Sequence, residues 1–311
     1  MSVQDITLIG VPLEAGAGRR GCIMGPDAFR TAGLSEALGE LGHSVRDVGN
    51  IQPEQVSLPE TPGVVLKNLD AIAGWTRALH GRALELGLRE TLPIYMGGDH
   101  ALAAGTVTGH AAAANELGRP LFVLWLDAHT DFNTLDSTRS GNLHGTPLAF
   151  ACGLPGFESY LGHPLNAPVD PGNVEILGVR SIDRQESELL LEYGVSVSDM
   201  RRIDEIGIAG LLRPFLDRVA EANGLLHVSL DVDFIDPEIA PAVGTTVPGG
   251  ATFREAHLVM EMLHDSGLVT SLDLVELNPF LDDRGRTARL MVDLTSSLFG
   301  KRVFDRPTRS F

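Results

Sequence analysis

Cysteine is nearly absent from the chain, which has only Cys22 and Cys152 among 311 residues. The two match no metal-binding or redox spacing, and so few cysteines in so long a chain indicate reduced thiols in a cytoplasm. No segment approaches the roughly 20 consecutive apolar residues that a membrane-spanning helix requires. Residues 1–5 also lack the basic and apolar regions of a secretory signal peptide. We therefore expect a cytoplasmic protein without a membrane-spanning segment.

Basic residues are scarce relative to acidic ones. The sequence has 24 Lys and Arg against 41 Asp and Glu, which gives a formal net charge of -17. A negative potential of this size repels nucleic acids and anionic membrane surfaces and attracts a cationic substrate. We expect no nucleic-acid partner and no membrane partner.

Short apolar runs alternate along the chain with longer helical patterns, and this alternation predicts βα units around a parallel sheet. The predicted strands are residues 6–9, 92–96, 121–126, 174–178, 225–231 and 269–275. The predicted helices are residues 64–86, 186–193, 205–222 and 253–266. Irregular stretches are predicted at residues 49–61, 134–145 and 278–289. None of these is a Ser/Gly-rich linker and no repeat is visible, so residues 1–311 are predicted to form a single domain.

The clearest chemical motif is Asp127-Ala-His129-Thr-Asp131, directly after the apolar run 121–126. If the backbone stays extended, alternate side chains point the same way, and the three polar groups converge. Ligands of open α/β sheets bind beyond the carboxyl ends of the strands, which is where this motif lies. For one such motif alone, a solvated strand end is an equally good interpretation.

Two further polar clusters follow predicted strands. Asp231 ends the strand 225–231 and Asp233 follows two residues later, and two carboxylates this close repel each other unless a cation lies between them. The segment 97–100 places His100 after two glycines that allow a tight turn into the same crevice. Three clusters at the ends of three strands favour a metal site over isolated strand ends.

The type of ligand indicates the type of metal. Carboxylates and imidazoles without thiolate suit Mn²⁺, with Fe, Co or Zn less favoured and Ca²⁺ disfavoured. Six such ligands exceed the needs of one ion, whereas bridging carboxylates allow two ions about 3.5 to 4 Å apart that share a hydroxide. The sequence therefore predicts a metal-dependent hydrolase with two Mn²⁺ per subunit.

Other polar residues allow two interpretations. Glu276 ends an otherwise apolar strand, where an acidic group is costly without a cationic partner, and a salt bridge to an internal Arg is the alternative to a functional role. The loop 140–145 carries hydroxyl, amide and imidazole groups but by itself is only a polar loop. The remaining histidines are interpreted as surface or core residues: His43, His80, His110, His163, His227, His257 and His264.

These motifs, in this order, resemble the arginase/agmatinase (ureohydrolase) family from residue 6 to about residue 298. The segments that carry the resemblance are DAHTDFN at 127–133, SLDVDFIDP at 229–237 and GTTVPGG at 244–250. The resemblance implies a three-layer αβα fold with a mostly parallel eight-stranded sheet. It also implies a Mn²⁺ pair and a homo-oligomer, either a trimer or a hexamer.

The resemblance further implies a ligand set, assigned position by position. One manganese ion would be held by His100, Asp127, Asp131 and Asp231. The other would be held by Asp127, His129, Asp231 and Asp233. Asp127 and Asp231 would bridge the two ions.

Substrate recognition is also implied by the resemblance. Loop 140–145 is similar to that of family members that hydrolyse L-arginine, whereas agmatinases usually lack its Asn-Leu-His arrangement. The substrate α-carboxylate would be read by Asn133, Ser140 and Asn142, and Asp183 and Glu186 would lie near the α-amino group. The chain departs from the family at Ser181, where animal members usually have Asp, and at Thr146, where Met or Gln is commoner. These departures bear on substrate affinity.

The expected reaction is hydrolysis of L-arginine to L-ornithine and urea by a metal-bridging hydroxide. Asp131 would pass a proton to the leaving nitrogen, and His144 would relay protons to and from solvent. Glu276 would orient the guanidinium group, and Thr245 would add a hydroxyl or backbone contact.

Three alternatives stay open at this point. The nearest is another ureohydrolase, namely an agmatinase, a guanidinobutyrase or a formimidoylglutamase. A two-metal phosphoesterase uses similar ligands, but the motif segments offer only Arg139 and Arg180 to neutralise a phosphate. A non-catalytic metal-binding homologue is the third alternative.

Overall fold

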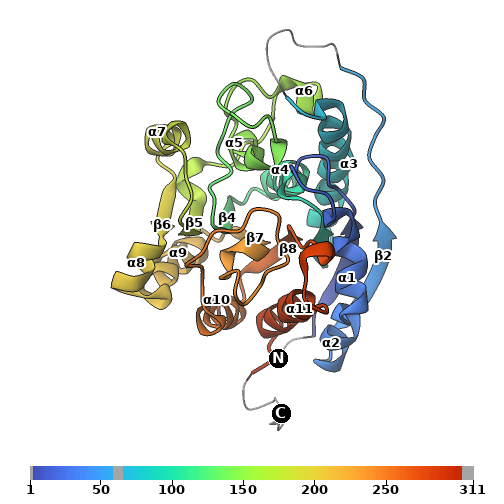
Figure 1. Ribbon diagram of the computed structural model, residues 1–311, viewed down its shortest axis with the longest axis vertical. Helices are drawn as coiled ribbons and strands as arrows, with labels where there is room; N and C mark the ends of the chain where they lie inside the picture. The colour runs from blue at the N-terminus through green and yellow to red at the C-terminus, as the bar shows by residue number, and fades with distance from the viewer. Residues whose placement is uncertain (1–2, 59–65, 303–311) are drawn as a thin grey trace.

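An eight-stranded parallel sheet forms the centre of the computed structural model, which describes residues 3–58 and 66–302. The strands are β1 Asp5–Val11, β2 Ser44–Asn50, β3 Leu92–Gly97, β4 Leu121–Leu126, β5 Val174–Val179, β6 Ser196–Asp199, β7 Leu225–Asp231 and β8 Val269–Val275. Their order across the sheet is β2-β1-β3-β8-β7-β4-β5-β6, and every neighbouring pair is parallel. Figure 1 shows β2 and β6 at the two edges.

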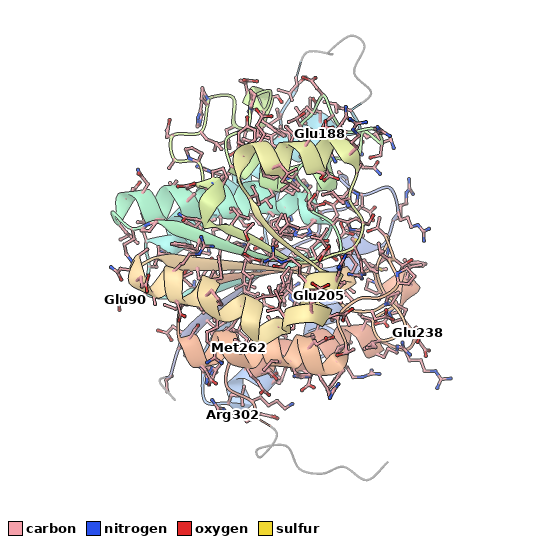
Figure 2. The ribbon with its side chains drawn as sticks, turned by 90° about the vertical axis from the view of Figure 1, so that its left-hand side faces the viewer. Glu90, Glu188, Glu205, Glu238, Met262 and Arg302 are labelled. Atoms are coloured by element: carbon pink, nitrogen blue, oxygen red, sulfur yellow. The ribbon has the colours of Figure 1, made fainter. Side chains whose placement is uncertain are left out.

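Helices cover both faces of the sheet because the strand side chains alternate between two separate hydrophobic clusters. One face packs against α1 Gly25–Thr31, α2 Leu34–Glu40, α8 Met200–Ile206, α9 Ile208–Glu221, α10 Phe253–Ser266 and α11 Arg286–Leu298. The other packs against α3 Leu69–Gly87, α4 Ala103–Glu116, α5 Pro147–Ala151, α6 Glu158–Leu161 and α7 Arg184–Tyr193. Figure 2 shows the sheet between these two layers, which confirms the αβα fold. Within the described ranges, no helix is long and apolar enough to cross a membrane.

Each of the six predicted strands is confirmed, and β2 and β6 are additional. Both are edge strands with polar, partly exposed sequences, so neither gives the apolar run that identifies a buried strand. The sheet is also fully parallel rather than mostly parallel.

Some helix predictions were wrong in detail. Residues 205–222 do not form one helix, because Gly207, with φ 80° and ψ 151°, separates α8 from α9. The predicted helix 64–86 corresponds to α3, which begins at Leu69, and residues 64 and 65 lie outside the described ranges. The stretch 278–289, predicted to be irregular, already contains the first turn of α11. The stretch 49–61 includes the end of β2, and its residues 59–61 are not described.

The strand order determines where the polar motifs meet. Strands β3, β8, β7 and β4 are consecutive in the sheet although they come from distant parts of the chain. Since all four are parallel, their carboxyl ends lie along one edge, and the residues that follow them share one crevice.

Candidate metal centre

Four neighbouring strands deliver the polar residues of the site. Asp127 follows β4, and Asp231 is the last residue of β7. His100 begins a short 3₁₀ helix after β3, and Glu276 follows β8. All four side chains are buried, so they face one another rather than solvent.

Two groups of side chains are close enough to hold a cation each. The ligand atoms of His100, Asp127 and Asp231 lie within 4.8 Å of one another, and so do those of Asp127, His129 and Asp233. Asp127 is common to both groups. The predicted ligand Asp131 also lies here, with one carboxylate oxygen 3.2 Å from Nδ1 of His100. The structure thus brings all six predicted ligands together.

The geometry around His100 suits a cation better than a hydrogen bond. Its Nδ1 atom is buried and has no hydrogen-bond partner, yet it lies 3.1 Å from Asp127 Oδ2 and 3.0 Å from Asp231 Oδ2. Its Nε2 atom lies 2.8 Å from the hydroxyl oxygen of Ser229. When Nε2 donates to Ser229, the lone pair of Nδ1 faces the carboxylates, as in a metal ligand. The oxygen and nitrogen donors, without sulfur, fit Mn²⁺.

The pKa values of the clustered Asp and His side chains also indicate that the site needs positive charge. Burial and the neighbouring carboxylates raise the pKa of Asp231 and Asp131 well above the usual value for Asp. Burial lowers the pKa of His129, but the contacts with Asp127 and Asp233 outweigh it and raise that pKa to about 12. The carboxylates of Asp131 and Asp231 therefore ionise only when positive charge, from protonated histidines or from metal ions, balances the cluster.

A second set of contacts orients the ligands. The indole nitrogen of Trp125 donates to Asp127 at 2.9 Å, and its ring stacks on His100 at 4.1 Å. The backbone N–H of Ala128 donates to Asp233 at 2.9 Å. Sequence reasoning did not identify Trp125 or Ser229. Each precedes a ligand by two residues on a strand and so shares its face, which is the signal that could have found them.

The predicted extended backbone through the motif 127–131 was wrong. Strand β4 ends at Leu126, and Asp131 has φ 47°, so the three side chains converge from an irregular loop. Glu186 supports this loop, because its carboxylate accepts hydrogen bonds from the Thr130 hydroxyl at 2.9 Å and the Phe132 N–H at 3.2 Å. Asp183 and Glu186 also form a capping box at the start of α7. Glu186 thus lies against the motif, and Asp183 is joined to Glu186 through the capping box.

Glu276, which is buried, and His144, which is half-buried, form a pair next to the predicted ligands. Glu276 Oε1 lies 2.9 Å from His144 Nδ1 and accepts the backbone N–H of His100 at 3.0 Å. Its other oxygen, Oε2, receives the thiol of Cys22 at 3.7 Å. Burial lowers the pKa of His144, but Glu276 outweighs it and raises that pKa to about 9. Within the described ranges no Arg pairs with Glu276, so the salt-bridge interpretation does not hold there.

The predicted substrate residues line the adjacent loops. Asn133 is buried and accepts the Ser137 hydroxyl at 2.8 Å, and its N–H donates to the carbonyl of Gly145 at 3.1 Å. Ser140 is exposed and accepts the N–H of Asn142 at 3.1 Å. Thr245 is exposed, and its hydroxyl lies 3.4 Å from Asp233.

Asp99 is a third residue that the sequence did not identify. It is fully buried and accepts the backbone N–H groups of Gly16 at 2.7 Å and Ala17 at 3.0 Å. The carbonyl of Gly16 in turn accepts the N–H of His144 at 3.3 Å. Asp99 therefore holds the loop after β1 against the loop that carries His144. No local pattern marks these contacts, because they join residues more than 80 positions apart.

The fold and the site together define a class: a three-layer α/β protein with a buried carboxylate–histidine centre at the carboxyl edge of its sheet. The sequence model of the Arginase family matches residues 4–300, and the chain belongs to this family of hydrolases. An arginase of Agrobacterium fabrum is 60% identical over 98% of this chain and 93% of that protein.

Two solved structures show the same fold. The arginase of Bacillus caldovelox has a TM-score of 0.88 at 38% identity, with 97% of this chain and 100% of that chain covered. The arginase of Entamoeba histolytica in complex with L-ornithine has a TM-score of 0.85 at 26% identity, with 97% and 100% covered.

Proposed function

We propose that the protein hydrolyses L-arginine to L-ornithine and urea. The observation that carries this proposal is Glu276, a buried carboxylate beside six metal-ligand side chains that has no arginine partner in the described ranges. Such a group is suited to pair with a guanidinium from outside. The arginase names of the close relatives support the same substrate, as does the L-ornithine bound to the Entamoeba enzyme.

The six ligand side chains would hold two Mn²⁺ ions per subunit. One ion would be bound by His100, Asp127, Asp131 and Asp231, and the other by Asp127, His129, Asp231 and Asp233. Such a pair lowers the pKa of a coordinated water, so that hydroxide is available near neutral pH.

Three side chains would act on the substrate. Glu276 would accept hydrogen bonds from the guanidinium N–H groups and orient the carbon that is attacked. Asp131 would take up the proton released by the attacking water and deliver it to the leaving nitrogen. His144, held at 2.9 Å from Glu276 and partly open to solvent, would relay protons between the site and water.

The role of His144 leads to a first prediction. His144→Ala should slow turnover while manganese stays bound, because His144 touches Glu276 and none of the six ligands. The measurement is steady-state urea release together with metal analysis of the purified variant. A variant that had lost its manganese would count against the relay role.

Recognition of the amino-acid end would come from the loops around the crevice. Asn133, Ser140 and Asn142 would bind the α-carboxylate, and Asp183 and Glu186 would lie near the α-amino group. Thr245 would contribute a hydroxyl or backbone contact. This arrangement favours L-arginine over agmatine, which has no carboxylate to bind.

Finer expectations belong to the same proposal. Residues 1–311 would form one catalytic domain that acts in the cytoplasm as a homotrimer or homohexamer. Light scattering coupled to size-exclusion chromatography measures the assembly directly, and a monomer would contradict it.

The deciding experiment is urea release by the purified protein with Mn²⁺, comparing L-arginine and agmatine at equal concentration. We expect strong preference for L-arginine, abolished by a chelator and restored by manganese. Preference for agmatine would refute the role of Asn133, Ser140 and Asn142. Absence of urea from both substrates would refute the proposal and direct attention to guanidinobutyrate and formiminoglutamate.

A further inference from the structure

Lys67 lies beside the loop 140–145 and is bonded to it twice. Its ammonium nitrogen donates to Asn142 Oδ1 at 2.9 Å, and its backbone N–H donates to the carbonyl of Gly141 at 2.9 Å. Two bonds from one residue, one from the side chain and one from the backbone, fix both the position of the charge and its distance from the loop.

The backbone next to Lys67 is held in an unusual conformation. Asn68 has φ 55°, in the left-handed region that few residues other than glycine adopt, and it immediately precedes α3. The Asn68 side chain donates to the carbonyl of Ala15 at 2.8 Å, in the same loop that Asp99 holds against His144. Such strain persists only where surrounding contacts maintain it. Lys67 is therefore anchored between two loops of the crevice.

This placement orients the amide of Asn142. The ammonium group has only donors, so Asn142 must present its oxygen to Lys67 and its Nδ2 group elsewhere. Gly18 leaves room for that group, because a Cβ atom at this position would lie 2.9 Å from Nδ2. Asn142 is thus available as a hydrogen-bond donor.

The charge of Lys67 also matters for the kind of substrate that the crevice accepts. Six buried acidic side chains surround the centre, and a substrate carboxylate is repelled by them wherever metal does not neutralise them. They are Asp99, Asp127, Asp131, Asp231, Asp233 and Glu276. An ammonium group fixed at the rim offsets this repulsion for a carboxylate, but not for an amine of the same length without one.

We propose that Lys67 is a specificity-determining residue that favours substrates with an α-carboxylate over their decarboxylated counterparts. It does so by fixing the amide of Asn142 and by placing one positive charge beside it. This inference rests on the proposed function, since it takes L-arginine as the substrate and loop 140–145 as the part of the site that binds the carboxylate.

The test compares Lys67→Gln, Lys67→Arg and Lys301→Gln in the full-length, manganese-loaded protein. Lys301 pairs with Asp293 after α11, so Lys301→Gln removes the same charge from another part of the protein. The measurements are kcat and KM for L-arginine and agmatine, and the affinities for L-ornithine and putrescine by calorimetry. Each pair of compounds differs by one carboxylate.

We expect Lys67→Gln to lower kcat/KM for L-arginine about 5- to 10-fold, mainly by raising KM. This is the size of effect expected when one partly exposed charged hydrogen bond is lost. Activity on agmatine should change less than about twofold, and Lys67→Arg should keep most of the preference. Lys301→Gln should leave kcat/KM unchanged for both L-arginine and agmatine. Equal losses on both substrates, or an unchanged preference, would overturn the inference about Lys67.

Failure of the proposed function would look different. In that case the unmodified protein would release no urea from either substrate. The comparison of L-ornithine with putrescine would then still test Lys67, because it measures binding and needs no turnover. An equal affinity change for both compounds in Lys67→Gln would overturn the inference there too.

Discussion

Among the single residues, the pair of His144 and Glu276 ties the stability of the fold to pH. Glu276 raises the pKa of His144 from 6.5 to about 9 against the effect of burial. A group whose pKa is raised on folding stabilises the protein fully below its unfolded pKa and loses that contribution as pH rises through its folded pKa. The window is therefore pH 6.5 to 9.

We expect the stability difference between the unmodified protein and His144→Asn to shrink across this window by up to about 3 kcal/mol, since each pKa unit corresponds to about 1.4 kcal/mol. Calorimetric unfolding at several pH values, with the manganese concentration held constant, measures it. A difference that stays constant from pH 6 to pH 10 would show that the pair contributes nothing to stability.

Ser229 gives a second prediction for a single residue. In the described part of the chain, its hydroxyl is the only hydrogen-bond partner of His100 Nε2, so Ser229→Ala should loosen the His100 ring and weaken manganese binding about 10- to 100-fold. Ser271→Ala is the matched control, because Ser271 is equally buried in the neighbouring strand but bonds His227 instead. Manganese affinity is measured by competition with a chelator. Equal effects of the two substitutions would mean that only packing is affected.

The side chains that meet in the cluster could be predicted from the sequence, but the residues that support them could not. Asp127, His129 and Asp131 stand in one short motif, and a carboxylate–imidazole set indicates a metal whatever the backbone does. The contact between Glu276 and Cys22 joins residues 254 positions apart, and that between Asp99 and Gly16 joins residues 83 apart. Contacts at such separations depend on the strand order, which local patterns do not determine.

Among the secondary-structure elements, the junction of α8 and α9 depends on one backbone conformation. Gly207, at φ 80° and ψ 151°, lies in a region that is open to glycine and costly for other residues. Gly207→Ala should therefore lower the free energy of unfolding by about 1 to 3 kcal/mol.

Gly81 provides the opposite case. It is an exposed glycine inside α3, and a Cβ atom there would meet nothing within 4 Å. Gly81→Ala should raise the free energy of unfolding by up to about 1 kcal/mol, because alanine favours the helix and restricts the unfolded chain. Both variants are compared by calorimetry. Stabilisation by Gly207→Ala would show that the break between α8 and α9 does not need glycine.

The elements that the sequence failed to predict have physical reasons in common. Helix α4 is buried on nearly all sides and is rich in Ala, Gly and Thr, so it lacks the apolar stripe that reveals a surface helix. Strand β6 has only four residues, SVSD, and β2, SVRDVGN, is mostly polar and exposed at the sheet edge. Central strands such as β4 were predicted because both of their faces are apolar.

For the whole molecule, the clustered carboxylates should make stability depend on metal. Removal of manganese by a chelator leaves buried anions that only protons can neutralise. At a free manganese concentration of about 1,000 times Kd, binding stabilises the fold by about 4 kcal/mol, which corresponds to roughly 8 °C in Tm. We expect added manganese to restore the Tm that chelation lowers. Ca²⁺ should not restore it, because the histidines disfavour Ca²⁺. A Tm that is indifferent to chelation would contradict a metal centre in these six side chains.

The position of β8 in the sheet has a consequence for folding during synthesis on the ribosome. Strands β1 to β3 and strands β4 to β7 meet in the sheet only through β8, which comes last in the chain among the strands of residues 3–58 and 66–302. A nascent chain that ends before Val269 therefore has two partial sheets with unpaired edges and no Glu276 beside its ligands. The residues of the candidate metal centre therefore come together only once β8 has paired with both partial sheets.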